Sequence, residues 1–432
     1  MHLADRGYFL IALSAVLAIS GAWADDSSLR WVWCWPAGIL SAGLALEAWL
    51  DPRISIQAEL QLHEKLLLGR GAQGVLCLQH NLQRLVTVRY ARTLPHAFAG
   101  DQDVFEVAVP PRDIASEPWS LRPVRLGPGE FVPLPARVLG RLRLAWWSRP
   151  LALTTAFNIA PDSLHGARQR AGGDVRGDTP YKMPGHGGEL FQLRSYIPGD
   201  PLARIDWKAS ARARALISRE MSEDQHLEIV LIVDAGRMSS MRAGALDRLG
   251  VYANITARFA EHAIKLDDRI GLVAYADRIL ALSPPGRGVV GVRRIREALE
   301  QLMTERAESQ PMVAARAVIR MARSRSLVIW LTDLDEPSGT TELQTAVRQL
   351  ALRHVVVCAG LDNATLHALR ARPARNWRDP YIALAAGAEA ERIRGLETFL
   401  RGAGALVVSA SAERLEYAVI HAYQSQRRRR RI

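Results

Sequence analysis

Two short apolar runs, each ending in an aspartate, constrain the fold of this 432-residue chain more than any other feature. They span residues 228–234 and 327–333, and neither alternates between apolar and polar side chains. A strand that is apolar on both faces is typical of a parallel sheet covered by helices on both sides. Further strands are expected at residues 270–275, 278–282, 354–359 and 406–409. With an amphipathic helix expected at 243–265, residues 227–426 are predicted to form a doubly wound α/β domain with a mostly parallel sheet.

Residues 1–53 carry two apolar runs that predict a transmembrane helical hairpin. Its spans are expected at about 8–24 and 31–50, close to the ~20 residues that cross a bilayer. A hairpin places both chain ends on one side of the membrane, where Arg6 and Arg53 lie. Because cytoplasmic flanks are the more basic ones, the rest of the chain is expected in the cytoplasm. The alternative is a signal peptide cleaved after the Ala-Trp-Ala sequence that ends the first run.

The region after the hairpin, residues 54–162, has the pattern of an all-β, sandwich-like domain. Segments such as 54–60 and 85–90 alternate, and Gly and Pro residues separate them. No catalytic constellation is present there, so a packing or protein-contact role is expected. Hydrophobic residues make up 49% of the chain and charged residues 23%, as in ordinary globular proteins. Three widely separated cysteines argue against a disulfide framework or a cysteine metal site.

Residues 163–226 are expected to be a linker followed by a dense segment of glycines, prolines and charges. Pro198 and Gly199 predict a tight turn, because proline fixes one central φ and glycine tolerates a positive one. Asp200 is expected to cap a helix that starts at Pro201. An extended segment is expected from residue 216 onward.

The charges of this segment permit a structural and a catalytic interpretation. In the structural one, Trp207 packs against a neighbouring domain while Arg204, Asp206, Lys208 and Arg212 form ion pairs that fix the join. The catalytic alternative centres on Asp206 and Lys208. Structural ion-pair networks imitate functional ones, so the structural interpretation is preferred.

This segment resembles the signature of the bacterial "domain of unknown function 58" family. The matching positions are Glu189, Leu193, Arg194, Tyr196, Pro198, Gly199, Asp200, Arg204, Ile205, Asp206, Trp207, Lys208, Ser210, Ala211 and Arg212. The resemblance implies a C-terminal von Willebrand factor A-like domain, a membrane anchor and a partner among the MoxR-type AAA+ ATPases.

The same resemblance raises the question of a metal site. Metal-binding von Willebrand A domains carry Asp-x-Ser-x-Ser after the first strand, with a Thr and a second Asp from other loops. Here Asp234 is kept, Arg237 enters the loop, and Ser239 and Ser240 are out of register. Asp333 lies where the second carboxylate belongs, and no Thr partner is assigned. Two carboxylates alone hold Mg²⁺ weakly, so a degenerate site whose rim binds protein is expected.

Several function classes find no support in the motifs. Residues 286–291 spell G-x-G-x-x-G but lack the acidic residue of a dinucleotide site, and no P-loop or H-E-x-x-H sequence occurs. The net charge is +12, and the tail from residue 427 to 432 holds five arginines, Arg427 to Arg431. A solvated chain end is one interpretation of these arginines and contact with anionic lipid is the other, whereas no aromatic interleaving supports a nucleic-acid site.

Three functions remain, in order of preference. The first is a non-enzymatic scaffold or adaptor in the bacterial cytoplasmic (inner) membrane, facing the cytoplasm, needing no cofactor and working with a MoxR-type ATPase. The second is a divalent-metal-dependent binding module that uses Asp234 and Asp333 with weakly held Mg²⁺. The third is an enzyme centred on Asp206 and Lys208.

Overall fold

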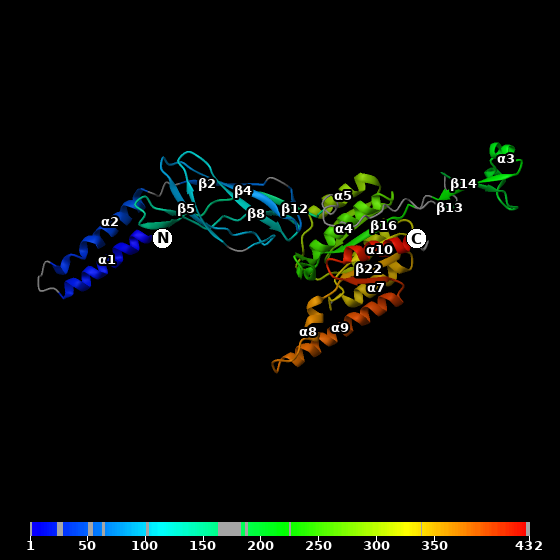
Figure 1. Ribbon diagram of the computed structural model, residues 1–432. Helices are drawn as coiled ribbons and strands as arrows, with labels where there is room; N and C mark the ends of the chain where they lie inside the picture. The colour runs from blue at the N-terminus through cyan, green and yellow to red at the C-terminus, as the bar shows by residue number, and fades with distance from the viewer. Residues whose placement is uncertain are drawn as a thin grey trace. The chain divides into compact units, whose positions relative to one another are not determined.

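The computed structural model describes residues 2–23, 29–50, 55–62, 65–100, 103–162, 183–185, 189–223, 226–337 and 339–428. The chain divides into two compact units, Met1–Pro161 and Asp162–Ile432 (Figure 1). Unit 1 holds the N-terminal helices and a β-rich region, and unit 2 holds a mixed, mostly parallel sheet with helices. Residues 163–182 of the predicted linker and residues 429–432 of the predicted tail lie outside the described residues.

Unit 1 begins with two apolar helices that pack against each other, α1 (Asp5–Ala22) and α2 (Cys34–Leu50). Within the described part of the chain, α1 is the one helix long and apolar enough to cross a membrane. The second expected span corresponds to α2, whose 17 residues fall short of the ~20 that a bilayer requires. One N-terminal span is therefore supported by length and composition.

Eleven strands follow the helices in the described residues of unit 1. Their bounds are β2 (Ile56–Leu62), β3 (Leu66–Leu67), β4 (Ala72–His80), β5 (Val86–Ala91), β6 (Phe98–Ala99), β7 (Val104–Val109), β8 (Ala115–Pro123), β9 (Gly127–Glu130), β10 (Ala136–Leu139), β11 (Ala145–Ser148) and β12 (Ala156–Ala160). With β1 (His2–Leu3), which precedes α1, the sheet orders are β1-β11-β10-β5-β7, β2-β4-β8-β6 and β3-β12-β9. All the pairings except β3 with β12 are antiparallel. Alternating burial along β4 shows one face turned to a core, where the indole N–H of Trp119 donates to the Tyr90 hydroxyl at 3.3 Å.

A buried carboxylate joins α2 to the β-rich region. Glu47 interrupts the apolar run of α2, and its side chain accepts the backbone N–H groups of Leu142 and Leu144 at 2.7 and 3.2 Å. It also accepts the indole N–H of Trp147 at 3.3 Å. Gly140 makes room for this contact, because a Cβ there would lie 2.3 Å from Glu47 Oε2. The polar residue inside the apolar helix therefore serves as an anchor to the turn before β11.

The segment before α1 is also part of this region. The strand β1 (His2–Leu3) pairs antiparallel with β11 and forms the edge of the five-stranded sheet. The N–H of Ala4 donates to the carbonyl of Leu144 at 2.8 Å, and Gly7 packs so closely that an added Cβ would lie 2.6 Å from the same oxygen. Cleavage of a signal peptide would remove both β1 and α1 from a unit that they help to build.

The sheet of unit 2 has six strands in the order β20-β19-β16-β21-β22-β23. Their bounds are β16 (Glu228–Asp234), β19 (Arg269–Tyr275), β20 (Ile279–Gly286), β21 (Leu327–Leu331), β22 (Val355–Leu361) and β23 (Leu406–Ala410). All neighbours are parallel except β19 and β20, which are antiparallel. The two apolar runs are the central strands, because only central strands are buried on both faces and along both edges.

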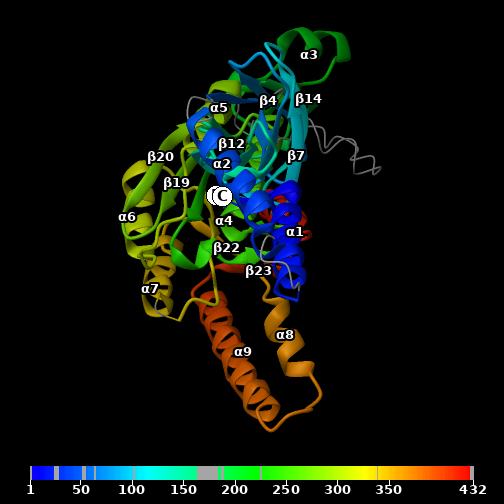
Figure 2. The ribbon, with the colours of Figure 1, turned by 90° about the vertical axis from the view of Figure 1, so that its left-hand side faces the viewer.

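Helices cover both faces of this sheet (Figures 1 and 2). One face carries α4 (Arg248–Ile264), α5 (Gly288–Glu300) and α10 (Leu415–Arg428), and the other carries α6 (Pro311–Met321), α7 (Thr340–Ala351) and α9 (Asp379–Gly402). The short helix α8 (Ala364–Ala371) packs against α9. Trp330 of β21 lies fully buried in the core beneath α6 and α7.

The expected helix at 243–265 is wrong at its start. The strands β17 (Arg242–Ala243) and β18 (Leu246–Asp247) form a small hairpin, in which Gly244 takes a φ of +70°. The Asp247 carboxylate then accepts the N–H of Gly250 at 2.8 Å and caps α4. The Asp247 cap, and not the apolar periodicity of the sequence, therefore sets the residue at which α4 begins.

The C-terminal helix also departs from expectation, because α10 runs through Arg428 and includes the first arginines of the predicted tail. Arg427 Nη1 lies 2.7 Å from a carboxylate oxygen of the buried Asp268, which also accepts the Tyr423 hydroxyl and the N–H of Leu227. Arg427 therefore belongs to the folded helix α10, and not to the tail that was predicted to begin at this residue. A buried carboxylate draws this arginine into the fold as its counter-charge.

The signature segment forms a small sheet with two short helical turns. Its strands β13 (Met183–Gly185), β14 (Glu189–Ser195) and β15 (Ile217–Glu223) pair in the order β13-β15-β14. Between β14 and β15 lie the 3₁₀ turn η3 (Leu202–Arg204) and the helix α3 (Trp207–Ala213). The expected extended segment after residue 216 is thus confirmed as β15.

Candidate functional site

Asp234 and Asp333 lie at the carboxyl edge of the unit 2 sheet. Asp234 ends β16, and Asp333 follows β21 by two residues. The two strands are parallel neighbours in register, so their ends come together at the edge where open α/β sheets place their sites. Both side chains are buried.

The carboxylate of Asp234 is fully engaged in hydrogen bonds. Oδ1 accepts the Ser309 hydroxyl at 2.5 Å and the N–H of Gly236 at 3.0 Å. Oδ2 accepts the Thr332 hydroxyl at 2.8 Å and the Tyr275 hydroxyl at 3.0 Å. These donors occupy the roughly four lone-pair positions of a carboxylate. Burial raises the pKa of Asp234, and the Ser309 hydrogen bond is the largest influence that opposes the rise.

Asp333 has three partners of its own. It accepts the Tyr252 hydroxyl at 2.8 Å and the Ser239 hydroxyl at 3.1 Å, and Arg248 Nη1 lies 3.1 Å from Oδ1. Burial raises the pKa of Asp333 to about 6, Arg248 opposes the rise and Asp234 adds to it. The hydroxyl of Ser239, which the sequence placed out of register, thus reaches this carboxylate.

Arg248 supplies the positive charge at this edge. The guanidinium binds Asp335 through both terminal nitrogens, at 2.5 and 2.6 Å, and it is itself buried. Asn363 donates a further hydrogen bond to Asp335 at 3.1 Å. This bidentate pair and the contact with Asp333 put an internal cation between two carboxylates. Arg248 therefore places a buried positive charge beside the carboxylates of Asp333 and Asp335.

The loop arginine of the sequence analysis does not take this role. Arg237 is more than half exposed and pairs with Glu308 at 3.4 Å. Within the described ranges, no three His, Cys, Asp or Glu side chains are arranged to hold a metal ion.

Sequence reasoning missed Arg248, Asp335 and Thr332 as members of this site. Asp335 and Thr332 lie within two residues of Asp333 in the sequence, so they could have been predicted as members of the site. Arg248 had no such signal, because it lies 87 residues from Asp335 and only the packing of α4 brings it there.

Glu336 is a further buried carboxylate near the same edge. Burial raises its pKa to about 7, and the nearby charges of Asp234, Asp333 and Glu308 act in the same direction. This residue therefore changes charge near neutral pH.

In the signature segment, the turn forms as expected but Asp200 has another role. Gly199 takes a φ of +111°. Asp200 accepts the N–H of Ile197 at 3.1 Å and pairs with Arg194 at 2.8 Å, and Arg194 also lies 3.6 Å from Glu220. The Arg194 hydrogen bond lowers the pKa of Asp200. The expected helix cap at Asp200 is wrong, because this carboxylate closes the turn instead.

The cap of α3 is Asp206. Its carboxylate accepts the N–H of Ala209 at 3.0 Å and the Arg219 side chain at 3.1 Å, and the Ala209 hydrogen bond lowers its pKa. Ser210 ties the helix to β15 by accepting the N–H of Ile217 at 2.9 Å. Asp206 thus has a structural part in this module.

Trp207, which was expected to pack against a neighbouring domain, has a side chain that is 66% exposed. Ile197 and Leu202 are also exposed, as are Lys208 and Arg212. The ion pairs of the segment form within the segment itself. Among the other signature residues, Tyr196 and Arg204 are partly buried, Pro198 is exposed, and the side chain of Glu189 lies outside the described part.

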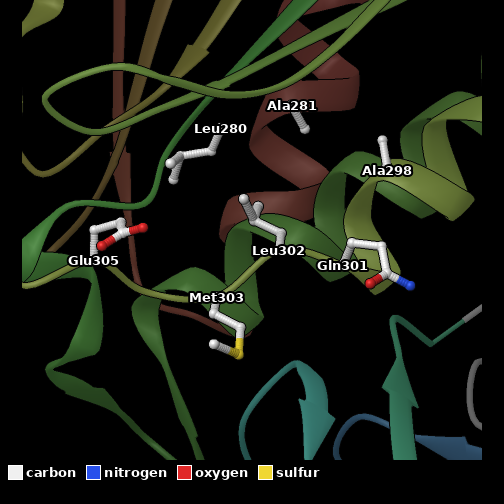
Figure 3. A pocket seen from close by; sticks show the side chains of 7 residues that line it. All are labelled: Leu280, Ala281, Ala298, Gln301, Leu302, Met303 and Glu305. Carbon is white, nitrogen blue, oxygen red and sulfur yellow. The ribbon is translucent and has the colours of Figure 1, made fainter.

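A pocket of about 310 Å³ lies beside β20 and α5 (Figure 3). It is lined by Leu280 and Ala281 of β20, Ala298 of α5, and Gln301, Leu302, Met303 and Glu305. Glu305 already accepts a hydrogen bond from Arg278 at 2.8 Å. Neither Asp234 nor Asp333 lines the pocket, so it is separate from the carboxylate edge.

Comparisons with known proteins agree with the signature. An uncharacterized protein of Mycobacterium bovis and one of Mycobacterium tuberculosis are each 39% identical over 67 residues, which is 16% of this chain. The chain spans about a fifth of the length of these curated relatives, since the match covers 21% of each.

Two solved structures are similar over parts of the chain. The CARDB domain of a Pyrococcus furiosus protein, solved with di-metal ions, is 10% identical with a TM-score of 0.19, covering 25% of this chain and 96% of that one. An uncharacterized membrane-spanning protein of Vibrio fischeri is 18% identical with a TM-score of 0.18, covering 46% of this chain and 98% of that one. Scores this low support no argument about fold or function.

A family model described as "Protein of unknown function DUF58" matches residues 192–368. The match begins in β14, includes η3 and α3, and extends through the central strands of the unit 2 sheet to α8. It confirms the resemblance drawn from the signature residues. Residues 192–368 of this chain are therefore a DUF58 family domain, and the family is one of unknown function.

Proposed function

We propose that this protein is a non-enzymatic scaffold or adaptor of the bacterial inner membrane that docks a MoxR-type AAA+ ATPase. The observation that carries the proposal is which side chains of the signature segment are engaged in its own fold and which are exposed. Its carboxylates Asp200 and Asp206 are used in a turn and a helix cap, while Trp207 is left exposed beside Lys208 and Arg212. Exposed tryptophan with flanking basic groups is typical of a protein-docking surface.

The membrane anchor of this proposal is the pair α1 and α2. The first helix is a candidate span, and we propose that α2 makes a second pass that returns the chain to the cytoplasmic side. In this arrangement Glu47 sits at the end of α2 that meets the β-rich region, which we take to be a sandwich-like spacer. A signal peptide is less compatible with β1 as part of the five-stranded sheet.

The unit 2 sheet is proposed to be a von Willebrand factor A-like domain. Parallel strands with helices on both faces support this proposal, as does the pair of aspartates at the carboxyl edge. The hydrogen bonds of Asp234 and the pairing of Arg248 with Asp333 favour a protein-binding rim over a metal-dependent site. The capping role of Asp206 gives no support to an enzyme centred on that residue and Lys208.

The test is capture of the intact chain from its native membrane in mild detergent, followed by mass spectrometry. We expect an AAA+ ATPase with the unmodified protein and at least tenfold less of it with Trp207→Ala, because exposed tryptophans are frequent hot spots. Tyr417→Ala is the matched control, since Tyr417 of α10 is also 74% exposed and lies elsewhere in unit 2. Failure to recover an ATPase with the unmodified protein would refute the proposal.

A further inference from the structure

The α8–α9 hairpin carries an exposed tip. The two helices pack against each other, and the C-terminal part of α9 is held to the domain by buried Leu396 and Leu400. The tip extends beyond the sheet (Figure 2). Every residue from 371 to 378 is exposed, whereas Ala390, Leu396 and Leu400 farther along α9 are buried.

The tip is strongly basic. Between Asp362 and Glu389 the sequence has four arginines, Arg370, Arg372, Arg375 and Arg378, and one acidic residue, Asp379. The acid is buried and accepts the backbone N–H groups of Arg375 and Asn376 at 2.7 and 2.8 Å. Asp379 is thus used to shape the loop, and the exposed charges of the tip are positive.

Aromatic and aliphatic side chains accompany these charges. Trp377 and Tyr381 are 74% and 68% exposed, and their rings meet edge to face with centroids 6.5 Å apart. The guanidinium of Arg378 lies over the Trp377 ring, 5.0 Å from its centroid. Ile382 and Leu384 on the first turns of α9 are exposed as well. Large apolar side chains gathered at one protruding end indicate an interaction surface rather than scattered exposure.

Basic side chains combined with Trp and Tyr fit one surface particularly well, the headgroup layer of an anionic bilayer. Arginines attract the phosphates there, and amphipathic aromatic rings prefer the boundary between headgroups and acyl chains. The chain itself holds a candidate membrane span in α1, which would tether unit 2 to a bilayer. A protein partner would have to supply a complementary acidic groove for the same residues.

We infer that the tip formed by Arg372, Arg375, Trp377, Arg378 and Tyr381 is a lipid-docking site that inserts into the headgroup layer of an anionic membrane. It gives unit 2 a contact with the bilayer in addition to the N-terminal helices. This inference goes beyond the proposed scaffold role and stands even if no ATPase is captured. It also assigns lipid contact to a folded hairpin, in contrast to the predicted Arg427–Arg431 tail.

The test places an environment-sensitive fluorophore on the tip of the full chain. Ala374→Cys provides the site, with Cys34→Ala and Cys77→Ala so that the fully buried Cys358 is the one other thiol. The protein is reconstituted in nanodiscs of phosphatidylcholine alone or with 30% phosphatidylglycerol. We expect a blue-shifted emission, and quenching by headgroup-level spin-labelled lipid, in the anionic discs but not in the neutral ones.

Charge removal then separates lipid docking from other contacts. Neutralising Arg372, Arg375 and Arg378 to Gln is expected to lower tip occupancy roughly a hundredfold, because each basic residue near an anionic surface contributes severalfold. The matched control neutralises Arg293, Arg316 and Arg320, which are exposed on α5 and α6, and should leave the emission unchanged. Raising NaCl to 0.5 M should reverse the shift by screening.

Three outcomes would overturn the inference. The first is the same emission in both kinds of disc, and the second is a shift that survives neutralisation of the tip arginines. The third is a shift that appears only when soluble cell protein is added, which would make the tip a protein-docking site. Because the substitutions lie on exposed positions, loss of the signal through misfolding is checked by unchanged thermal unfolding.

Discussion

Asp234→Ala distinguishes two interpretations of Asp234. In one, the carboxylate is a hydrogen-bonded hub, that is, a structural acceptor for several buried donors, and in the other it is a metal ligand. In an empty cation site, Asp234 and Asp333 repel each other, so removal of one carboxylate should stabilise the metal-free protein. In the structure, however, Asp234 accepts hydrogen bonds from Ser309, Thr332, Tyr275 and the N–H of Gly236. The two interpretations therefore predict effects of opposite sign.

The magnitude follows from these donors. The hydroxyls of Ser309 and Thr332 can turn to other acceptors, whereas the N–H of Gly236 is fixed and Tyr275 is fully buried. At about 1–3 kcal/mol for each buried group left without a partner, the loss is about 2–6 kcal/mol. Release of a buried charge offsets part of it, because burial raises the pKa of Asp234. We expect a net destabilisation of about 3 kcal/mol.

The assay is hydrogen exchange by mass spectrometry on the intact chain in detergent, since slow amides in β16 and β21 report the stability of unit 2 alone. A loss of about 3 kcal/mol accelerates their exchange roughly a hundredfold. Asp277→Ala, which removes a partly exposed carboxylate after β19, is the control and should change little. Unchanged or slower exchange in Asp234→Ala, or Mg²⁺ protection confined to the unmodified protein, would refute the hub.

Three other predictions concern buried charges. The raised pKa of Glu336 means that its contribution to the stability of unit 2 falls as pH rises from about 4.3 to about 7. Glu336→Gln should therefore stabilise unit 2 by up to about 3 kcal/mol at pH 8. Hydrogen exchange measured across this pH range should show a weaker pH dependence in the variant. Glu47→Ala should destabilise unit 1 by about 2–4 kcal/mol in thermal unfolding, because two backbone N–H groups lose their acceptor; an unchanged midpoint would contradict the anchor. Arg427→Ala should cost about 2–4 kcal/mol by leaving buried Asp268 without its counter-charge, whereas Arg428→Ala on the exposed side of α10 should have little effect on the same exchange measurement.

Much of the unit 2 fold was predictable from local pattern. Continuous apolar runs mark strands buried on both faces, and the runs at 228–234 and 327–333 are the two central strands of the sheet. Helix boundaries were harder to predict from the sequence, because one or two capping residues determine where a helix begins. The start of α4 at Arg248 and the Asp206 cap of α3 both illustrate this limit.

The environment of the candidate site was not predictable to the same extent. The sequence placed Asp234 and Asp333 at strand ends, but several of their partners come from other parts of unit 2. Tyr275, Ser309 and Arg248 reach the edge from β19, a loop and α4. Such contacts depend on how helices pack on the sheet, and no local pattern encodes that packing.

The DUF58 signature, the apolar N-terminal helix and the parallel-sheet character of the second unit were predictable, because each follows from residues close together in the chain. The partners of the charged side chains became known only from the folded chain. It paired Arg248 with Asp333 and Asp335, drew Arg427 to Asp268, and left Trp207 and Trp377 exposed. The free energy of a charge depends on its burial and on partners distant in sequence, so both are known only once the chain has folded.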